Sequence, residues 1–172
     1  EENIHVIPVS LGKGTLNMPK YPGKDSIRFI SAFRMTWEKN IFGNIYLVKL
    51  IKDRGYNVKY DIYGDGADLS QIYYLIDRYN LTEHVAVKGK VSNESLKAEL
   101  INYDFFLQLS ISEALSASVL EAQAAGLPAI ISNSGGLPET VIKDKSAIVE
   151  DFTELSNIAD KVISLWRNEE KY

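Results

Sequence analysis

The stretch of sequence that decides the fold is residues 110–139, which read SISEALSASVLEAQAAGLPAIISNSGGLPE. It follows the apolar run 103–109, which is typical of a buried strand. Residues 118–125 contain no helix breaker and predict a short helix, and the β-branched residues in 129–132 predict the next strand. The stretch is therefore a polar loop and a helix that connect two strands.

Serines and helix breakers set the limits of this short helix. Ser116 and Ser118 are residue types that favour the N-cap, and Gly126 and Pro128 end the helix. In an open α/β sheet, ligands bind outside the carboxyl ends of the strands, and the polar loop lies there. The loop is therefore the first candidate for a binding site.

Strands and helices alternate along the rest of the chain as well. This alternation predicts a Rossmann-like three-layer α/β/α fold with a mostly parallel sheet of about six strands, covered by helices on both faces. Ser92 or Asn93 caps one helix, and Asp151 with Glu154 predicts a capping box before the last helix. Strands are expected at 27–33, 58–63, 85–91, 103–109, 129–132 and 147–150, and helices at 41–54, 70–79, 93–101, 118–125, near Pro138 and from 155 to 166.

Composition excludes several classes of site. The chain has 172 residues, 45% of them hydrophobic, which suits a single globular domain. It has no cysteine and two histidines, so disulfides, thiolate metal sites and multi-histidine metal sites are not expected. The net charge is −4, with no basic tract of the kind that binds nucleic acid. No run reaches transmembrane length and no signal peptide opens the chain, so we expect a cytoplasmic protein.

Residues 1–25 differ from the remainder because prolines and glycines are dense there. This segment is predicted to be a strand-like start, with Val6-Ile7-Pro8, followed by a loop close to a neighbouring domain. The abrupt start of the chain suggests a domain excised from a longer protein.

Two basic residues follow the first strand of the regular pattern. Arg34 and Lys39 lie where that strand gives way to a helix, so they can present their charges to an anion, or they can be solvated surface charges. Gly64 and Gly66 follow the second strand and favour a tight turn. The third glycine of a dinucleotide-binding fingerprint is missing, because Leu69 holds its position.

These landmarks together resemble one family. Glu113 and Glu121 are separated by seven residues, and the run 135–139 reads GGLPE. With the five-residue spacing of Arg34 and Lys39, they resemble the C-terminal, donor-binding domain of retaining family 4 glycosyltransferases with the GT-B fold (glycosyl transferases group 1). The resemblance covers about residues 4–167. The family often has glycine where this chain has Ala114 and Ser116.

The resemblance implies a role for each candidate site residue. Arg34 and Lys39 would hold the donor diphosphate and stabilise the charge on the leaving phosphate without a metal or other cofactor. Glu113 would lie beside the transferred sugar as a catalytic residue, and Glu121 would bind the ribose. The remaining expected contacts to the nucleotide sugar are main-chain groups of Leu115, Ser116, Ala117 and Ser118, a backbone approach at Gly64 and Gly66, and base recognition at Val91.

The implied function is that of the donor-binding half of a retaining, hexosyl-type glycosyltransferase of polysaccharide biosynthesis. The donor would be a UDP- or GDP-linked sugar, and the acceptor a saccharide or a lipid-linked acceptor. An N-terminal GT-B domain would complete the active site, so this domain alone is expected to be inactive, and the full-length enzyme could associate with a membrane. A non-catalytic nucleotide-sugar-binding module and a nucleotide-sugar epimerase of the GT-B fold are the alternatives.

Overall fold

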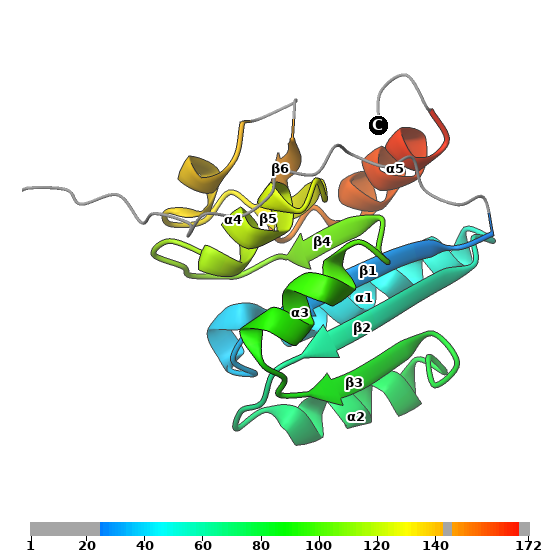
Figure 1. Ribbon diagram of the computed structural model, residues 1–172. Coiled ribbons are helices and arrows are strands. Elements are labelled where there is room, and N and C mark those ends of the chain that lie inside the picture. The colour runs from blue at the N-terminus through cyan, green and yellow to red at the C-terminus, as the bar shows by residue number, and fades with distance from the viewer. Residues whose placement is uncertain (1–24, 143–145, 169–172) are drawn as a thin grey trace, which may run out of the picture.

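A computed structural model describes residues 25–142 and 146–168 (Figure 1). The expected strand and loop at 1–25, including Val6–Pro8, lie outside the described residues except for residue 25. Within them, six parallel strands form one sheet in the order β3-β2-β1-β4-β5-β6. The strands are β1 (Ile27–Ala32), β2 (Val58–Tyr63), β3 (Val85–Gly89), β4 (Phe105–Gln108), β5 (Ala129–Ser132) and β6 (Ala147–Glu150).

Helices cover both faces of the sheet, which confirms the predicted three-layer α/β/α fold. Figure 1 shows α3 and α4 in front of the sheet and α1 and α2 behind it, and α5 packs beside α1. Two short 3₁₀ segments, η1 and η2, accompany these helices. The bounds are α1 (Ile41–Asp53), α2 (Leu69–Arg78), α3 (Asn93–Leu100), α4 (Ala117–Ala124), α5 (Leu155–Trp166), η1 (Trp37–Lys39) and η2 (Leu137–Thr140).

Each face of the sheet has its own hydrophobic core. On one face, α1, α2 and α5 bury aliphatic side chains such as Ile45, Ile72 and Val162 against the strands. On the other face, Val119 and Ala122 of α4 belong to the second core. The central strands β4 and β5 are buried throughout, and β1 is buried except at Arg28, which fits their largely apolar sequences. β2 alternates apolar with polar residues, and β3, at the edge of the sheet, is buried only at Val85.

β2, β5 and β6 have the predicted bounds, whereas β1, β3 and β4 are shorter than the sequence predicts. β3 stops at Gly89, where the backbone takes φ +72°, and not at residue 91. β4 covers four residues of the predicted 103–109. Before it, the Asp104 carboxylate accepts a hydrogen bond from Arg28 N, and after it, Leu109 N donates to the Asn44 side chain. These side chains take the place of ladder hydrogen bonds.

The helix starts follow the predicted caps with one exception. Ser116 caps α4 and Ser92 caps α3, each by accepting a hydrogen bond from a main-chain N–H of the first turn. The predicted capping box at 151–154 is wrong: the N-cap of α5 is Glu154, without a side-chain hydrogen bond, and Asp151 instead accepts hydrogen bonds from Thr153. The short segment η1 was not expected.

Candidate functional site

A cleft of about 340 Å³ opens at the carboxyl edge of the sheet, between the segment that follows β1 and the loop that follows β4. β1 and β4 are neighbours in the sheet, and the chain leaves them in opposite directions across it. The cleft is therefore at the topological switch point, where open α/β sheets bind ligands. Its lining residues are Ala32, Phe33, Arg34, Glu38, Lys39, Gln108, Glu113, Leu115, Ser116, Ala117 and Ser118.

The segment after β1 is held against the turn after β2. Met35 is fully buried, and its N–H donates to the Asp65 carbonyl at 2.9 Å. A Cβ on Gly64 would lie 2.0 Å from the Phe33 carbonyl oxygen, and one on Gly66 would lie 2.2 Å from the Met35 carbonyl oxygen. Because neither glycine has a side chain, the main chain of Phe33 and Met35, on either side of Arg34, can pack directly against the main chain of Gly64 and Gly66.

The loop after β4 rests on a second pair of glycines. Cβ atoms on Gly135 and Gly136 would lie 1.9 Å and 1.6 Å from the carbonyl oxygens of Glu113 and Ala114. Gly136 N also donates to the Glu113 carbonyl at 2.9 Å. Only residues without a side chain allow this approach, so the run 135–136 positions the main chain that carries Glu113.

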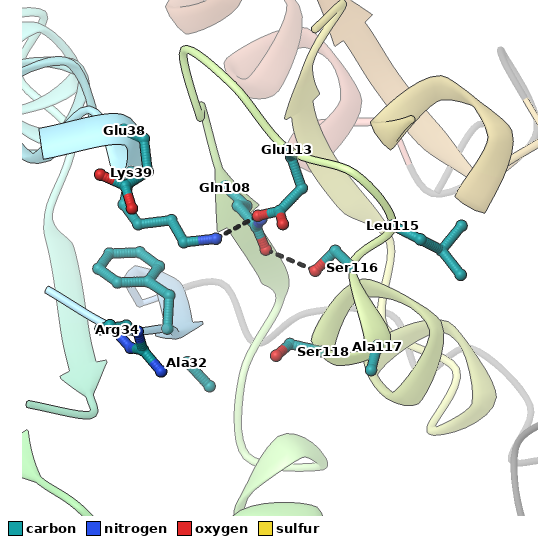
Figure 2. A pocket seen from close by; sticks show the side chains of 11 residues that line it. Ala32, Arg34, Glu38, Lys39, Gln108, Glu113, Leu115, Ser116, Ala117 and Ser118 are labelled. Carbon is teal, nitrogen blue, oxygen red and sulfur yellow. Dashed lines mark hydrogen bonds and ion pairs between the residues drawn. The ribbon is translucent and has the colours of Figure 1, made fainter. Parts of the chain in front are cut away.

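Lys39 and Glu113 form an ion pair across the cleft. Figure 2 shows the two side chains pointing toward one another, one from η1 and one from the loop after β4. Each side chain is only 15% exposed, so the pair is partly shielded from water. Arg34, in contrast, is exposed where it lines the cleft.

Gln108 lies beneath Glu113 and is 1% exposed. Its Nε2 donates to Glu113 Oε2 at 2.7 Å. Its Oε1 accepts from Ser116 Oγ at 2.9 Å, as Figure 2 shows. Ser116 Oγ in turn accepts from Val119 N. A continuous chain of hydrogen bonds thus connects the N-terminus of α4 with the carboxylate in the cleft.

Asn44 joins the two sides of the cleft from within α1. Its buried side chain donates to the main-chain oxygens of Lys39 and Asn40, at 2.8 and 3.0 Å, and accepts from Leu109 N at 3.1 Å. Ile111 N also donates to the Glu38 carbonyl at 2.8 Å. The two cleft-lining segments are therefore fixed to each other as well as to the sheet.

Several residues that the resemblance singled out lie outside the lining of this cleft. Glu121 faces α3, where it accepts from Asn93 Nδ2 at 3.0 Å and pairs with Lys97 at 3.6 Å. Val91 is 38% exposed in the loop after β3. Gly64 and Gly66 do not line the cleft but pack against the main chain on either side of Arg34. The structure brings together Arg34, Lys39, Glu113, Leu115, Ser116, Ala117 and Ser118.

Sequence reasoning missed Gln108, Glu38 and Asn44. Gln108 stands within an apolar run, although a glutamine at the end of a buried strand is itself a signal. Hydrogen bonds to the main chain at residue 38 and to the Thr36 side chain lower the pKa of the Glu38 carboxyl, so a second negative charge lines the cleft. Among the described residues, no group of three or more histidines and acids could hold a metal ion.

Comparison with known proteins identifies the family. Residues 17–172 match the model of the family described as Glycosyl transferases group 1, so the chain belongs to that family. It is 30% identical over 126 residues to the putative colanic acid biosynthesis glycosyltransferase WcaL of Escherichia coli, covering 70% of this chain and 31% of that protein. It is 26% identical over 147 residues to 2-deoxystreptamine N-acetyl-D-glucosaminyltransferase of Niallia circulans, covering 86% and 37%.

Solved structures show the same fold at low identity. A variant of S. aureus TarM, in complex with fondaparinux, alpha-GlcNAc-glycerol and UDP, matches with a TM-score of 0.80 and 21% identity, covering 92% of this chain and 32% of that chain. Anabaena HepE in complex with UDP-glucose matches with a TM-score of 0.77 and 17% identity, covering 86% and 41%. This chain spans about a third of the length of the curated relatives it matches. Within the described residues, no helix is long and apolar enough to cross a membrane.

Proposed function

We propose that this chain is the donor-binding, C-terminal domain of a two-domain glycosyltransferase of the retaining family 4 type. The observation that carries the proposal is the cleft at the switch point, which gathers Arg34, Lys39, Glu113 and the N-terminus of α4 within one site. Membership of the glycosyl transferases group 1 family and the UDP-bound neighbours of the same fold support a nucleotide-activated sugar as ligand.

The cations of the cleft suit a diphosphate. Arg34 is exposed and available to a phosphate, and Lys39 can turn from Glu113 to the diphosphate. The first main-chain N–H groups of α4 add a helix N-terminus on the same side. When the bond between sugar and phosphate breaks, negative charge grows on the leaving diphosphate, and these fixed groups stabilise it.

The two glutamates divide the rest of the donor between them. Glu113, at the cleft, faces the transferred sugar, where it binds hydroxyl groups and steadies positive charge at the anomeric carbon. Glu121, on α4 and outside the cleft lining, binds the ribose diol. Val91, in the loop after β3, contacts the base. The nucleotide then runs from the cleft along α4 toward the start of α3.

The acceptor side of the enzyme belongs to the part that this chain does not contain. We infer that an N-terminal domain closes the cleft and presents a saccharide or lipid-linked acceptor. The chain alone then binds donor weakly and has no transferase activity. The sugar is transferred with retention of the anomeric configuration.

Calorimetry or ligand-observed NMR with UDP, GDP and a panel of their sugar conjugates tests the proposal. Arg34→Ala should weaken binding of the preferred diphosphate by about 1.5–3 kcal/mol, the scale of a hydrogen bond to a charged group. Arg78→Ala is the matched control, because Arg78 lies on the exposed face of α2. If the parent chain binds no nucleotide of the panel, or if Arg34→Ala behaves as Arg78→Ala does, the proposal is wrong.

A further inference from the structure

We propose that Gln108 is a positioning residue that holds the Glu113 carboxylate in its sugar-facing orientation, through a hydrogen-bond chain anchored at the N-terminus of α4. The proposal rests on the function proposed above, because it assigns a role toward the sugar to Glu113. The chain runs from Val119 N to Ser116 Oγ, then to Gln108 Oε1, and from Gln108 Nε2 to Glu113 Oε2.

The burial of Gln108 is the first argument. The three residues before it in β4 are Phe105, Phe106 and Leu107, and the strand lies in the middle of the sheet. A primary amide that is 1% exposed costs free energy unless its groups are hydrogen-bonded. Both ends of this amide are used: Nε2 donates to Glu113 Oε2 and, at 3.3 Å, to Ser110 Oγ, and Oε1 accepts from Ser116 Oγ. Glu113 and Ser116 belong to the cleft lining. An apolar residue at this position of β4 would pack without this cost. The polar side chain therefore has its use in bonding the loop after β4 and not in stabilising the sheet.

The direction of the chain is the second argument. A carboxylate only accepts hydrogen bonds, so the NH₂ group of Gln108 must face Glu113. The Ser116 oxygen accepts from Val119 N as the N-cap of α4, so its hydroxyl hydrogen is free to donate to Gln108 Oε1. The amide therefore has one favourable orientation. The reverse orientation would set its carbonyl against the carboxylate.

The Lys39–Glu113 pair is the third argument. Lys39 and Gln108 both bind Oε2 of Glu113. When a diphosphate draws Lys39 away, Glu113 loses its counter-ion, and the hydrogen bond from Gln108 is the contact that keeps the carboxylate in place. A residue that bonds Glu113 before and after this exchange is suited to positioning, since its amide is already bonded to Glu113, Ser110 and Ser116.

Two substitutions separate positioning from a structural role. Gln108→Leu keeps the volume but removes the donor to Glu113. Gln108→Glu keeps the shape and places a second, buried carboxyl group beside the Glu113 carboxylate. Burial and the neighbouring negative charge make the introduced carboxyl hold its proton to higher pH. When this carboxyl group is protonated, it donates a hydrogen bond to Glu113 as the amide does. When it is ionised, it repels the Glu113 carboxylate. The charged groups that line the cleft around it are Arg34, Glu38, Lys39 and Glu113.

The measurement is the affinity of the 172-residue chain for UDP or GDP and for the sugar conjugate that it binds best. Gln108→Leu should leave the affinity for the free diphosphate within about twofold and weaken the sugar conjugate about tenfold, the loss of one hydrogen bond to a charged group. Gln108→Glu should bind the sugar conjugate nearly as the parent does at about pH 5 and about tenfold more weakly at about pH 8.5. The parent is measured at both pH values.

The matched control is Gln123→Leu. Gln123 lies on α4, donates to the Thr140 carbonyl and accepts from Ser146 Oγ, and does not line the cleft. The Gln123→Leu variant should be less stable in urea denaturation, with unchanged affinities for the free diphosphate and for the sugar conjugate. If Gln108→Leu weakens both ligands equally, or if Gln108→Glu shows no more pH dependence than the parent, the positioning role is wrong while the function stands. A parent chain that binds no nucleotide overturns both.

Discussion

At the residue scale, Lys39 has one counter-ion in the structure and is proposed to have another in the complex. In the structure it pairs with Glu113, and both side chains are mostly shielded from water. A bound diphosphate would offer it a stronger partner with more negative charge. Donor binding therefore includes the cost of separating a partly buried ion pair, unless the diphosphate and Glu113 share the ammonium group.

This competition predicts an unusual result for one substitution. Glu113→Gln removes the competing charge and its repulsion of phosphate, so the chain should bind free UDP or GDP about three- to tenfold more tightly, the scale of one net hydrogen bond. The sugar conjugate should gain less, because the proposed contact with the sugar is weakened. Titration calorimetry of both ligands measures the difference.

Glu121→Gln is the contrasting variant for the same titrations. Glu121 faces α3 and is proposed to bind the ribose, so its substitution should weaken the free diphosphate and the sugar conjugate alike. An unchanged diphosphate affinity in Glu113→Gln would show that Glu113 does not compete with the diphosphate for Lys39.

Part of the candidate site could be predicted from individual residues and part could not. Arg34, Lys39 and Glu113 are charged residues at the carboxyl ends of neighbouring strands, and the structure places all three on one cleft. Gln108 escaped attention because a single polar residue in an apolar run does not show which groups it bonds. The position of Glu121 against α3 depends on packing between two helices, which no local pattern specifies.

At the scale of elements, the loop that carries Glu113 depends on the turn after β5. The carbonyls of Glu113 and Ala114 lie where Cβ atoms of Gly135 and Gly136 would be. A side chain at either position must displace main chain, which cannot move as cheaply as the end of a side chain. Gly135 and Gly136 therefore determine the position of the loop that carries Glu113, although neither glycine lines the cleft.

Gly136→Ala should displace this loop. We expect a loss of about 1–3 kcal/mol in the free energy of unfolding, as for other overpacked sites, and a clear loss of affinity for the sugar conjugate. Gly55→Ala is the control: Gly55 has φ +86° with open space around it, so it adds backbone strain at the end of α1 without a clash. Urea denaturation and calorimetry of both variants should show two destabilised proteins, of which only Gly136→Ala binds poorly.

The start of β4 makes the stability of the sheet depend on pH. Burial raises the pKa of the Asp104 carboxyl from its ordinary value of 3.8 to about 6. The folded state thus holds this proton more tightly than the unfolded state, and ionisation of Asp104 penalises folding. The penalty is absent below about pH 4, grows as the pH rises from about 4 to about 6, and is complete above about 6.

Asp104→Asn should remove this dependence. The free energy of unfolding of the variant relative to the parent should rise by about 2–3 kcal/mol between about pH 4 and about pH 7, whatever the fixed cost of the new amide. Urea denaturation at the two pH values measures it. A constant difference between variant and parent would mean that Asp104 ionises alike in both states.

Element type and order were predictable, because apolar strands, cap residues and helix breakers act locally. The ends of the elements were less predictable. β4, for example, is bounded by hydrogen bonds to the side chains of Asp104 and Asn44, and Asn44 belongs to another element, α1. The segment η1 also lacked a signal, since its end depends on Asn40 in a left-handed conformation with φ 49°. Asn40 then caps α1 by accepting from Gly43 N.

At the scale of the whole molecule, sheet topology brings distant residues together. Seventy-four positions separate Lys39 from Glu113 in sequence, yet parallel pairing of β1 with β4 places their loops at the same edge. Strand order could be anticipated only through the resemblance to a known fold. The residue pattern alone predicts a parallel sheet but not which two strands stand at its switch point.

The same arrangement predicts that the proposed diphosphate ligand binds without a metal ion. Arg34, Lys39 and the N-terminus of α4 converge on the cleft, and together they can neutralise the two phosphates. The carboxylates near them, Glu38 and Glu113, come from opposite sides of the cleft, and Glu113 already has Lys39 as its partner.

The affinity for UDP or GDP should therefore agree within about twofold in excess EDTA and in millimolar Mg²⁺, the scale of weak screening effects. Titration calorimetry in the two buffers measures it, with Arg34→Ala as a variant whose binding is weak in both. Recovery of Arg34→Ala by Mg²⁺, or a loss of parent binding in EDTA, would show that a cation and not the protein carries the phosphate charge.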